Sequence, residues 1–137
     1  MRLFKSSEYA IRSLVYMAVS GIEVCSVKTL SDALDIPYKF LGRLMSRLGA
    51  AGIVTSQQGK LGGYSITRPL HEVHLADIID VVEGLESYDR CILGFETCDD
   101  KNPCPLHDQW SGHKDGIREM IDNVTLADLA RSDCKRI

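Results

Sequence analysis

Three of the five cysteines, Cys91, Cys98 and Cys104, lie within a stretch of fourteen residues. Six and five residues separate them, and the Asp, Asn, Pro and Gly residues in between predict an irregular loop that can wrap one cofactor. Thiolates are soft ligands that suit an iron–sulfur cluster or zinc. Alternatively, the thiols bind no metal and act as redox switches or have no role. Cys25 and Cys134 lie away from this spacing, and we expect one of them to be buried and the other exposed.

Three cysteines leave one coordination position of such a cofactor open. His107 follows Cys104 by three residues, at the expected start of a helix, so its imidazole can complete the site. A cluster held by one non-cysteine ligand has an exchangeable position and an altered potential, as histidine ligands do in Rieske centres. This property suits a sensor of oxidants, nitric oxide or iron supply.

The composition limits what kind of protein positions this loop. A chain of 137 residues with 45% apolar content forms one hydrophobic core with at most one appended element. It has no run of about 18 apolar residues and no signal peptide, so we expect a soluble cytoplasmic protein with no membrane partner. Its cysteines are too few and too unevenly spaced for a secreted disulfide scaffold. No nucleophile elbow, zinc-protease motif or catalytic carboxylate pair is present, so we expect no enzymatic activity.

Charge is distributed unevenly between the two halves of the chain. Residues 1–68 contain nine Lys or Arg against four Asp or Glu, a balance of +5, whereas residues 69–137 contain seven against fifteen, a balance of -8. A basic N-terminal half in an acidic protein indicates binding to a polyanion. A chance fluctuation of surface charge is the alternative.

A helix-turn-helix is predicted between residues 26 and 51. A short helix with one apolar face ends before Pro37, which is suited to the first turn of a second helix. Apolar residues line one face of this second helix and basic residues line another, as in a recognition helix that enters the major groove. A basic face exposed only to water gives the same stripe. The basic residues are Lys39, Arg43 and Arg47.

Residues 52–68 predict a β-hairpin with a glycine-rich turn. Ile53, Val54 and Thr55 suit a first strand, and Tyr64, Ile66 and Thr67 suit a second. The glycines in the turn allow its backbone to approach a DNA backbone or minor groove closely. A nucleotide-binding loop is a weaker interpretation, because such a loop leads into a helix and this one leads into a strand.

Two more helices are predicted in the second half of the chain. Residues 74–83 have a helical period that ends at Gly84, and a longer helix begins near Pro105. Apolar residues recur along the longer helix at spacings of three and four, which is typical of a seam that packs against another helix. Packing on the core of the same chain explains the period equally well. As candidate dimer contacts we take Trp110, Ile117, Met120, Ile121 and Val124.

Four segments together resemble a known family: MRLFKSSEYAIRSL at the start, AGIVTSQQGKLGGYSITRP at the hairpin, VVEG before the loop and CPLHDQW after it. The chain is similar to the iron–sulfur-dependent winged-helix regulators, the family of the cluster-biogenesis regulator IscR, the nitric oxide sensor NsrR and the iron-responsive regulator RirA. The resemblance extends from Met1 to about Leu129. Gln58 and Gly42 depart from the Arg and the polar residue that members often carry, which leaves the preferred DNA sequence open.

The resemblance implies a homodimer whose long C-terminal helices cross and present two winged helix-turn-helix units to a palindromic operator. It also implies a cluster near the dimer interface that changes DNA affinity. IscR-type members favour His107 as the fourth ligand, whereas NsrR-like members use a carboxylate of the partner subunit at the place of Glu8. With His107, a [2Fe-2S] cluster is favoured over [4Fe-4S].

These observations predict a mainly α fold with a small two-stranded β wing and a long C-terminal dimerisation helix. Residues 1–84 form a winged helix-turn-helix domain, 85–105 the cysteine loop, and 106–137 the dimerisation helix and tail. The predicted function is a sequence-specific DNA-binding regulator, a repressor, controlled by the cluster. A metal-free regulator that uses thiols, a small molecule or a partner protein is the alternative, and a cluster carrier is a third. The predicted DNA contacts are Lys28, Tyr38, Lys39, Arg43, Ser46, Arg47, Gln57, Gln58, Lys60, Gly62 and Gly63.

Overall fold

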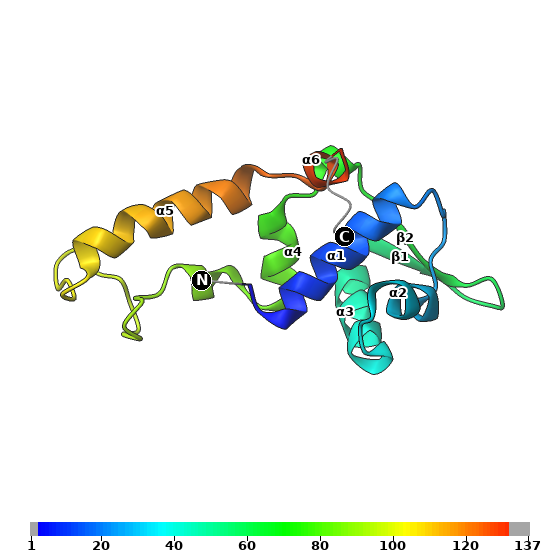
Figure 1. Cartoon of the computed structure of the whole chain (residues 1–137), viewed down its shortest axis with the longest axis horizontal. Coiled ribbons are helices and arrows are strands. Elements are labelled where there is room, and N and C mark those ends of the chain that lie inside the picture. Colours follow the sequence, from blue (N-terminus) through cyan, green and yellow to red (C-terminus); the bar gives the residue numbers. More distant parts are fainter. Residues whose placement is uncertain (1–2, 132–137) are drawn as a thin grey trace.

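The computed structural model describes residues 3–131, in which helices predominate and two short strands form one antiparallel sheet (Figure 1). The predicted fold class, mainly α with a small wing, is confirmed. Cys134 lies outside the described residues. The elements are α1 (Lys5–Val19), α2 (Val27–Leu34), α3 (Tyr38–Ala50), β1 (Val54–Gln57), β2 (Gly63–Ile66), the 3-10 turn η1 (Leu70–Glu72), α4 (Leu75–Val82), the 3-10 turn η2 (Leu85–Tyr88), α5 (His107–Asn123) and α6 (Leu126–Ala130).

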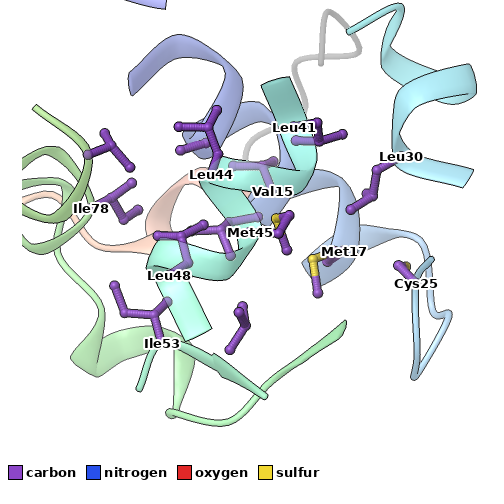
Figure 2. Packing of buried hydrophobic residues seen from close by; sticks show 14 of the residues in the cluster. Val15, Met17, Cys25, Leu30, Leu41, Leu44, Met45, Leu48, Ile53 and Ile78 are labelled. Atoms are coloured by element: carbon purple, nitrogen blue, oxygen red, sulfur yellow. The ribbon is translucent and has the colours of Figure 1, made fainter. Parts of the chain in front are cut away.

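Helix α1 lies at the centre of the main core. Leu14 and Val15 of α1 are buried against Leu41 and Met45 of α3 and against Ile78 of α4 (Figure 2). Helix α1 contacts α2, α3, α4, α6 and β2, so one helix holds the helix-turn-helix, the hairpin and the rest of the body together. A burial of this extent makes the N-terminal part of the chain a rigid platform.

The turn between α2 and α3 is tight. Ser26 caps α2 by accepting the backbone N–H of Thr29 at 3.0 Å, and Asp35 ends this helix in the left-handed conformation with φ of 53°. Pro37 then sits at the N-cap of α3, where its missing N–H has no effect on the helix. The hairpin follows in the register Val54 to Ile66, and it forms the wing.

Helix α5 extends away from the body of the protein (Figure 1). A small second core joins the two: Ile121 of α5 is buried with Ile79 of α4 and Tyr88 of η2. The cysteine loop lies at the distal end of α5, and the wing lies at the opposite end of the molecule (Figure 1). Within one protomer, η2 and α4 on one side and α5 on the other connect the loop to the rest of the fold.

Across residues 3–131, none of the helices has the length and apolar character needed to span a membrane.

Candidate metal centre and nucleic-acid interface

The cysteine loop brings its four predicted donors together as two pairs. The Sγ atoms of Cys91 and Cys104 lie 3.4 Å apart, and Cys98 Sγ lies 3.5 Å from Nδ1 of His107. The three cysteines line one cavity of about 500 Å³. In the described part of the chain, no three His, Cys, Asp or Glu side chains are already grouped to hold a single metal ion.

The first cysteine is positioned by anchors on both neighbouring helices. Three residues before Cys91, the hydroxyl of Tyr88 donates to Oε1 of Glu83, just past α4, at 2.5 Å. The indole N–H of Trp110 on α5 donates to the carbonyl of Arg90 at 3.2 Å. Cys91 itself is 5% exposed. The start of the loop is thus fixed, although the loop has no regular secondary structure.

The Cys91 and Cys104 thiols differ in acidity. Burial raises the pKa of Cys91, but backbone groups of Leu93, Gly94 and Phe95 and the thiol of Cys104 stabilise its thiolate and leave the pKa lowered overall. Burial and the neighbouring Cys91 thiolate raise the pKa of Cys104. Cys91 is therefore the first of the two to become a thiolate, the form that binds metal and attacks disulfides.

His107 is oriented by a carboxylate that the sequence did not single out. The His107 side chain is only 10% exposed, and its Nε2 lies 2.8 Å from Oδ1 of Asp100. A proton on Nε2 satisfies this contact and leaves the Nδ1 lone pair directed toward Cys98. Metal-binding histidines in proteins are commonly held by a carboxylate in this way. Asp100 carries no sequence signal for this role, because several acidic residues share the irregular loop.

The donor set fits an iron–sulfur cluster chemically, since three thiols and one oriented imidazole are soft or borderline ligands arranged in two pairs. Glu8, the rival fourth ligand, lies on α1 and pairs with Nζ of Lys5 at 3.1 Å. His107, in contrast, contacts Cys98 directly through Nδ1. Within one protomer the structure therefore groups His107, and not Glu8, with the cysteines.

The five candidate dimer residues, four on α5 and Val124 at its C-terminal cap, face different surroundings. Ile121 is 1% exposed because it packs against the body of its own chain, whereas Met120 is 52% exposed. Ile117 is half-buried beside Ile121, and Trp110 and Val124 are also half-buried. Met120 therefore offers the largest exposed apolar surface of this group.

The outer face of α3 carries the predicted DNA contacts in an exposed position. Tyr38 is 58% exposed, and Lys39, Arg43 and Ser46 are exposed beside it. Together with Phe40 and residues of neighbouring elements, they line an open groove. This surface is free of any covering element in the described chain, as a recognition helix requires.

The wing carries exposed polar residues, and at two of its positions only glycine fits without a steric clash. Gln57, Gln58 and Lys60 are exposed at the tip of the hairpin. A Cβ atom on Gly62 would collide with carbonyl oxygens of the turn, and one on Gly63 with the backbone segment that precedes α2. These two glycines are thus needed for close packing within the chain, a role that the sequence analysis did not anticipate.

Two of the predicted DNA contacts already have partners within the chain. Lys28 forms an ion pair with Asp32 at 3.1 Å, one turn along α2. Arg47 Nη1 donates a hydrogen bond to the carbonyl of Val82, the last residue of α4, at 3.0 Å. Arg47 thereby connects the recognition helix with the end of α4.

Comparison with known proteins agrees with this architecture. Residues 3–132 match the Rrf2 family, described as iron-dependent transcriptional regulators. The chain is 29% identical over 133 residues to the HTH-type transcriptional regulator IscR of Pectobacterium atrosepticum, which covers 96% of this chain and 80% of that protein.

Solved structures show the same fold. The structure of CymR, described as the global cysteine regulator of B. subtilis, matches with a TM-score of 0.78 and 27% identity over 95% of this chain and 96% of CymR. The structure of IscR from T. potens matches with a TM-score of 0.71 and 26% identity over 94% of this chain and 85% of that one. The relatives thus include proteins named for two different regulatory roles.

Proposed function

The chain belongs to the Rrf2 family of transcriptional regulators, and from this premise we propose that an iron–sulfur cluster on its cysteine loop controls its affinity for a palindromic operator. As a member of this family it is a DNA-binding regulator and not an enzyme. The family contains regulators named for different signals, so the type of sensor has to be argued from this chain's own residues.

One observation carries the proposal: four donors occur as two close pairs, with the three cysteines lining one cavity and His107 in contact with Cys98. Cys91 with Cys104, and Cys98 with His107, supply two ligands each, at 3.4 and 3.5 Å. A [2Fe-2S] cluster has two irons that each take two protein ligands, so this pairing favours it over a [4Fe-4S] cluster. When bound, the cluster supplies a one-electron redox centre that reacts with oxidants and nitric oxide.

The chain's own residues divide the DNA contact between base edges and backbone. Tyr38, Lys39, Arg43 and Ser46 on the exposed face of α3 are suited to the major groove. The exposed wing tip, with Lys60 as its cation, is suited to the sugar–phosphate backbone or minor groove. Recognition of a palindrome requires two such units, which a second copy packed along α5 would supply.

The test is a titration of operator DNA with cluster-loaded and cluster-free protein prepared without oxygen. We expect visible absorption bands, about two irons and two sulfides per subunit, and a large difference between the two dissociation constants. Cys98→Ser should abolish the bands, whereas Cys25→Ser, at a buried thiol outside the loop, should retain them. Iron-free protein that resists reconstitution would refute the cluster.

A thiol switch is the second candidate, and the short distance between Cys91 and Cys104 favours it. A peroxide would take two electrons and two protons from these thiols, forming one S–S bond and releasing one molecule of water and one of alcohol, or two of water from hydrogen peroxide. Mass spectrometry of the oxidised, cluster-free protein decides between the candidates. A Cys91–Cys104 disulfide that changes DNA affinity in a protein unable to bind iron would support the switch.

A further inference from the structure

Arg47 differs from the other basic residues of α3 in its contacts. Its guanidinium donates to the carbonyl oxygen of Val82 at 3.0 Å, whereas the side chains of Lys39 and Arg43 have no hydrogen bond or ion pair with the described part of the chain. All three residues are exposed and line the same groove, so the hydrogen bond is what sets Arg47 apart. The carbonyl groups in the last turn of a helix have no partner within that helix. Arg47 thus satisfies a group at the end of α4 and fixes the distance between α3 and α4.

The residue after Val82 continues this connection toward the loop. The Glu83 carboxylate accepts the Tyr88 hydroxyl at 2.5 Å through Oε1, and Ser6 of α1 donates to Oε2 at 3.5 Å. Burial has the largest effect on the pKa of Tyr88, and the hydrogen bond to Glu83 and the negative charge of Glu83 have smaller effects. All of them raise this pKa, so the phenol stays protonated and donates. Tyr88 is 6% exposed and packs with Ile79 of α4.

Tyr88 is also the start of a short segment that leads directly to the first cluster ligand. Only Asp89 and Arg90 separate it from Cys91, and both are held by α5. Arg118 donates to the Asp89 carboxylate at 3.2 Å, and Trp110 donates to the Arg90 carbonyl at 3.2 Å. Because this segment is short and held at both residues, a movement of Cys91 on loading or loss of the cluster should also move Tyr88.

We propose that Tyr88, Glu83 and Arg47 form the mechanical link between the cysteine loop and the recognition helix, and that Arg47 serves this link instead of contacting DNA. The proposal rests on the proposed function, because it requires DNA affinity to depend on the cluster. It assigns three positioning residues, none of which lines the cysteine cavity. The two ends of the link are the two elements whose coupling a cluster-controlled regulator needs.

The test compares the ratio of the operator dissociation constants of cluster-free and cluster-loaded protein among variants. Tyr88→Phe keeps the buried ring and removes only the hydroxyl, and Glu83→Gln keeps the shape of its acceptor. Arg47→Ala removes the other end of the link. A hydrogen bond to a charged group contributes about tenfold to an equilibrium constant, so we expect each variant to bring the ratio about tenfold closer to one while the visible spectrum is retained.

Arg43→Ala is the matched control on the same face of α3. It should weaken binding of both states equally and lower the salt slope of the dimer by about 1.8, because each of the two subunits loses one phosphate contact worth about 0.9. Arg47→Ala should leave the salt slope unchanged. If Arg47→Ala instead behaves like Arg43→Ala, Arg47 is a DNA contact and the link is refuted.

Hydrogen exchange gives a readout that does not involve DNA. The backbone N–H groups of Glu83 and Gly84 donate to the carbonyl of Ile79 at 2.9 and 3.1 Å. Their protection should change on cluster loading in the wild type and not in Tyr88→Phe. A wild type whose affinity responds to the cluster, with variants that respond equally, overturns the link and leaves the proposed function intact. A wild type with no response overturns both.

Discussion

Met120 and Ile121 are consecutive residues of α5 whose substitution should have opposite consequences. Ile121 is 1% exposed and Met120 is 52% exposed, so the first contributes to the protomer and the second is available to another molecule. We predict that Ile121→Ala destabilises the folded protomer, whereas Met120→Ala weakens the homodimer and leaves the protomer almost unchanged. Glu119→Ala, at an exposed residue of the same helix, is the control for helix propensity.

The magnitudes follow from the burial of the two side chains. Truncation of a buried isoleucine to alanine costs about 2–5 kcal/mol, and the small core around Ile121 can partly collapse, so we expect about 2–3 kcal/mol. Burial of a whole methionine side chain contributes about 1.5–3 kcal/mol. The half of Met120 that remains exposed would contribute about 1 kcal/mol per subunit, or roughly 30-fold in the dimer dissociation constant.

Analytical ultracentrifugation measures the dimer constant, and urea unfolding at several protein concentrations measures the stability. For a dimer, the unfolding midpoint rises with protein concentration, so the two contributions separate. If Met120→Ala forms dimers as tightly as the wild type does, the exposed face of α5 is not the interface. If Ile121→Ala unfolds at the wild-type midpoint, the second core does not hold α5 to the body.

Three further variants test individual contacts. Asp100→Ala removes the carboxylate that orients the fourth ligand and should weaken cluster retention by about tenfold. The charge-matched Glu96→Ala, at a residue that lines the cavity but does not contact His107, should not weaken retention, and iron release to a chelator measures both. Asp128 has a lowered pKa because the backbone N–H and hydroxyl of Thr125 bind its carboxylate. A carboxyl group whose pKa is lower in the folded state stabilises the protein at pH values above its unfolded pKa, and this stabilisation is lost as the pH falls through the folded pKa. Asp128→Ala should therefore lower the urea midpoint at neutral pH and leave it unchanged well below pH 3.8. Gly63→Ala should cost about 1–3 kcal/mol in urea unfolding, because the added Cβ meets backbone that cannot move away.

Local sequence patterns were sufficient for the fold. The helix-turn-helix depends on Pro37 and on apolar spacing, and the wing depends on β-branched residues around glycines, which are all short-range signals. The same signals did not show whether a given face of a helix packs against its own chain or is exposed. The period of α5 predicts one apolar face, but only the three-dimensional packing shows that Ile121 meets its own chain and that Met120 does not.

The candidate site was predictable in its residues and not in its pairing. Spacing identified Cys91, Cys98, Cys104 and His107, because clustered thiols with a histidine close by in the sequence are metal-ligand candidates. An irregular loop has no period, so nothing in the sequence says which cysteine approaches which, or that Asp100 holds the imidazole. Both facts depend on how the loop closes against the start of α5.

Arg47 illustrates the limit of reasoning from a helical stripe. A spacing of four residues places Lys39, Arg43 and Arg47 along one side of α3 and predicts one common role. The C-terminus of α4, however, lies beside only the last of them, and its free carbonyl at Val82 accepts the guanidinium. The same stripe therefore holds two cations that are available to a polyanion and one that is held by the protein. Because the cysteine loop begins within a few residues of that carbonyl, Arg47 is the cation of the stripe best placed to report the state of the loop.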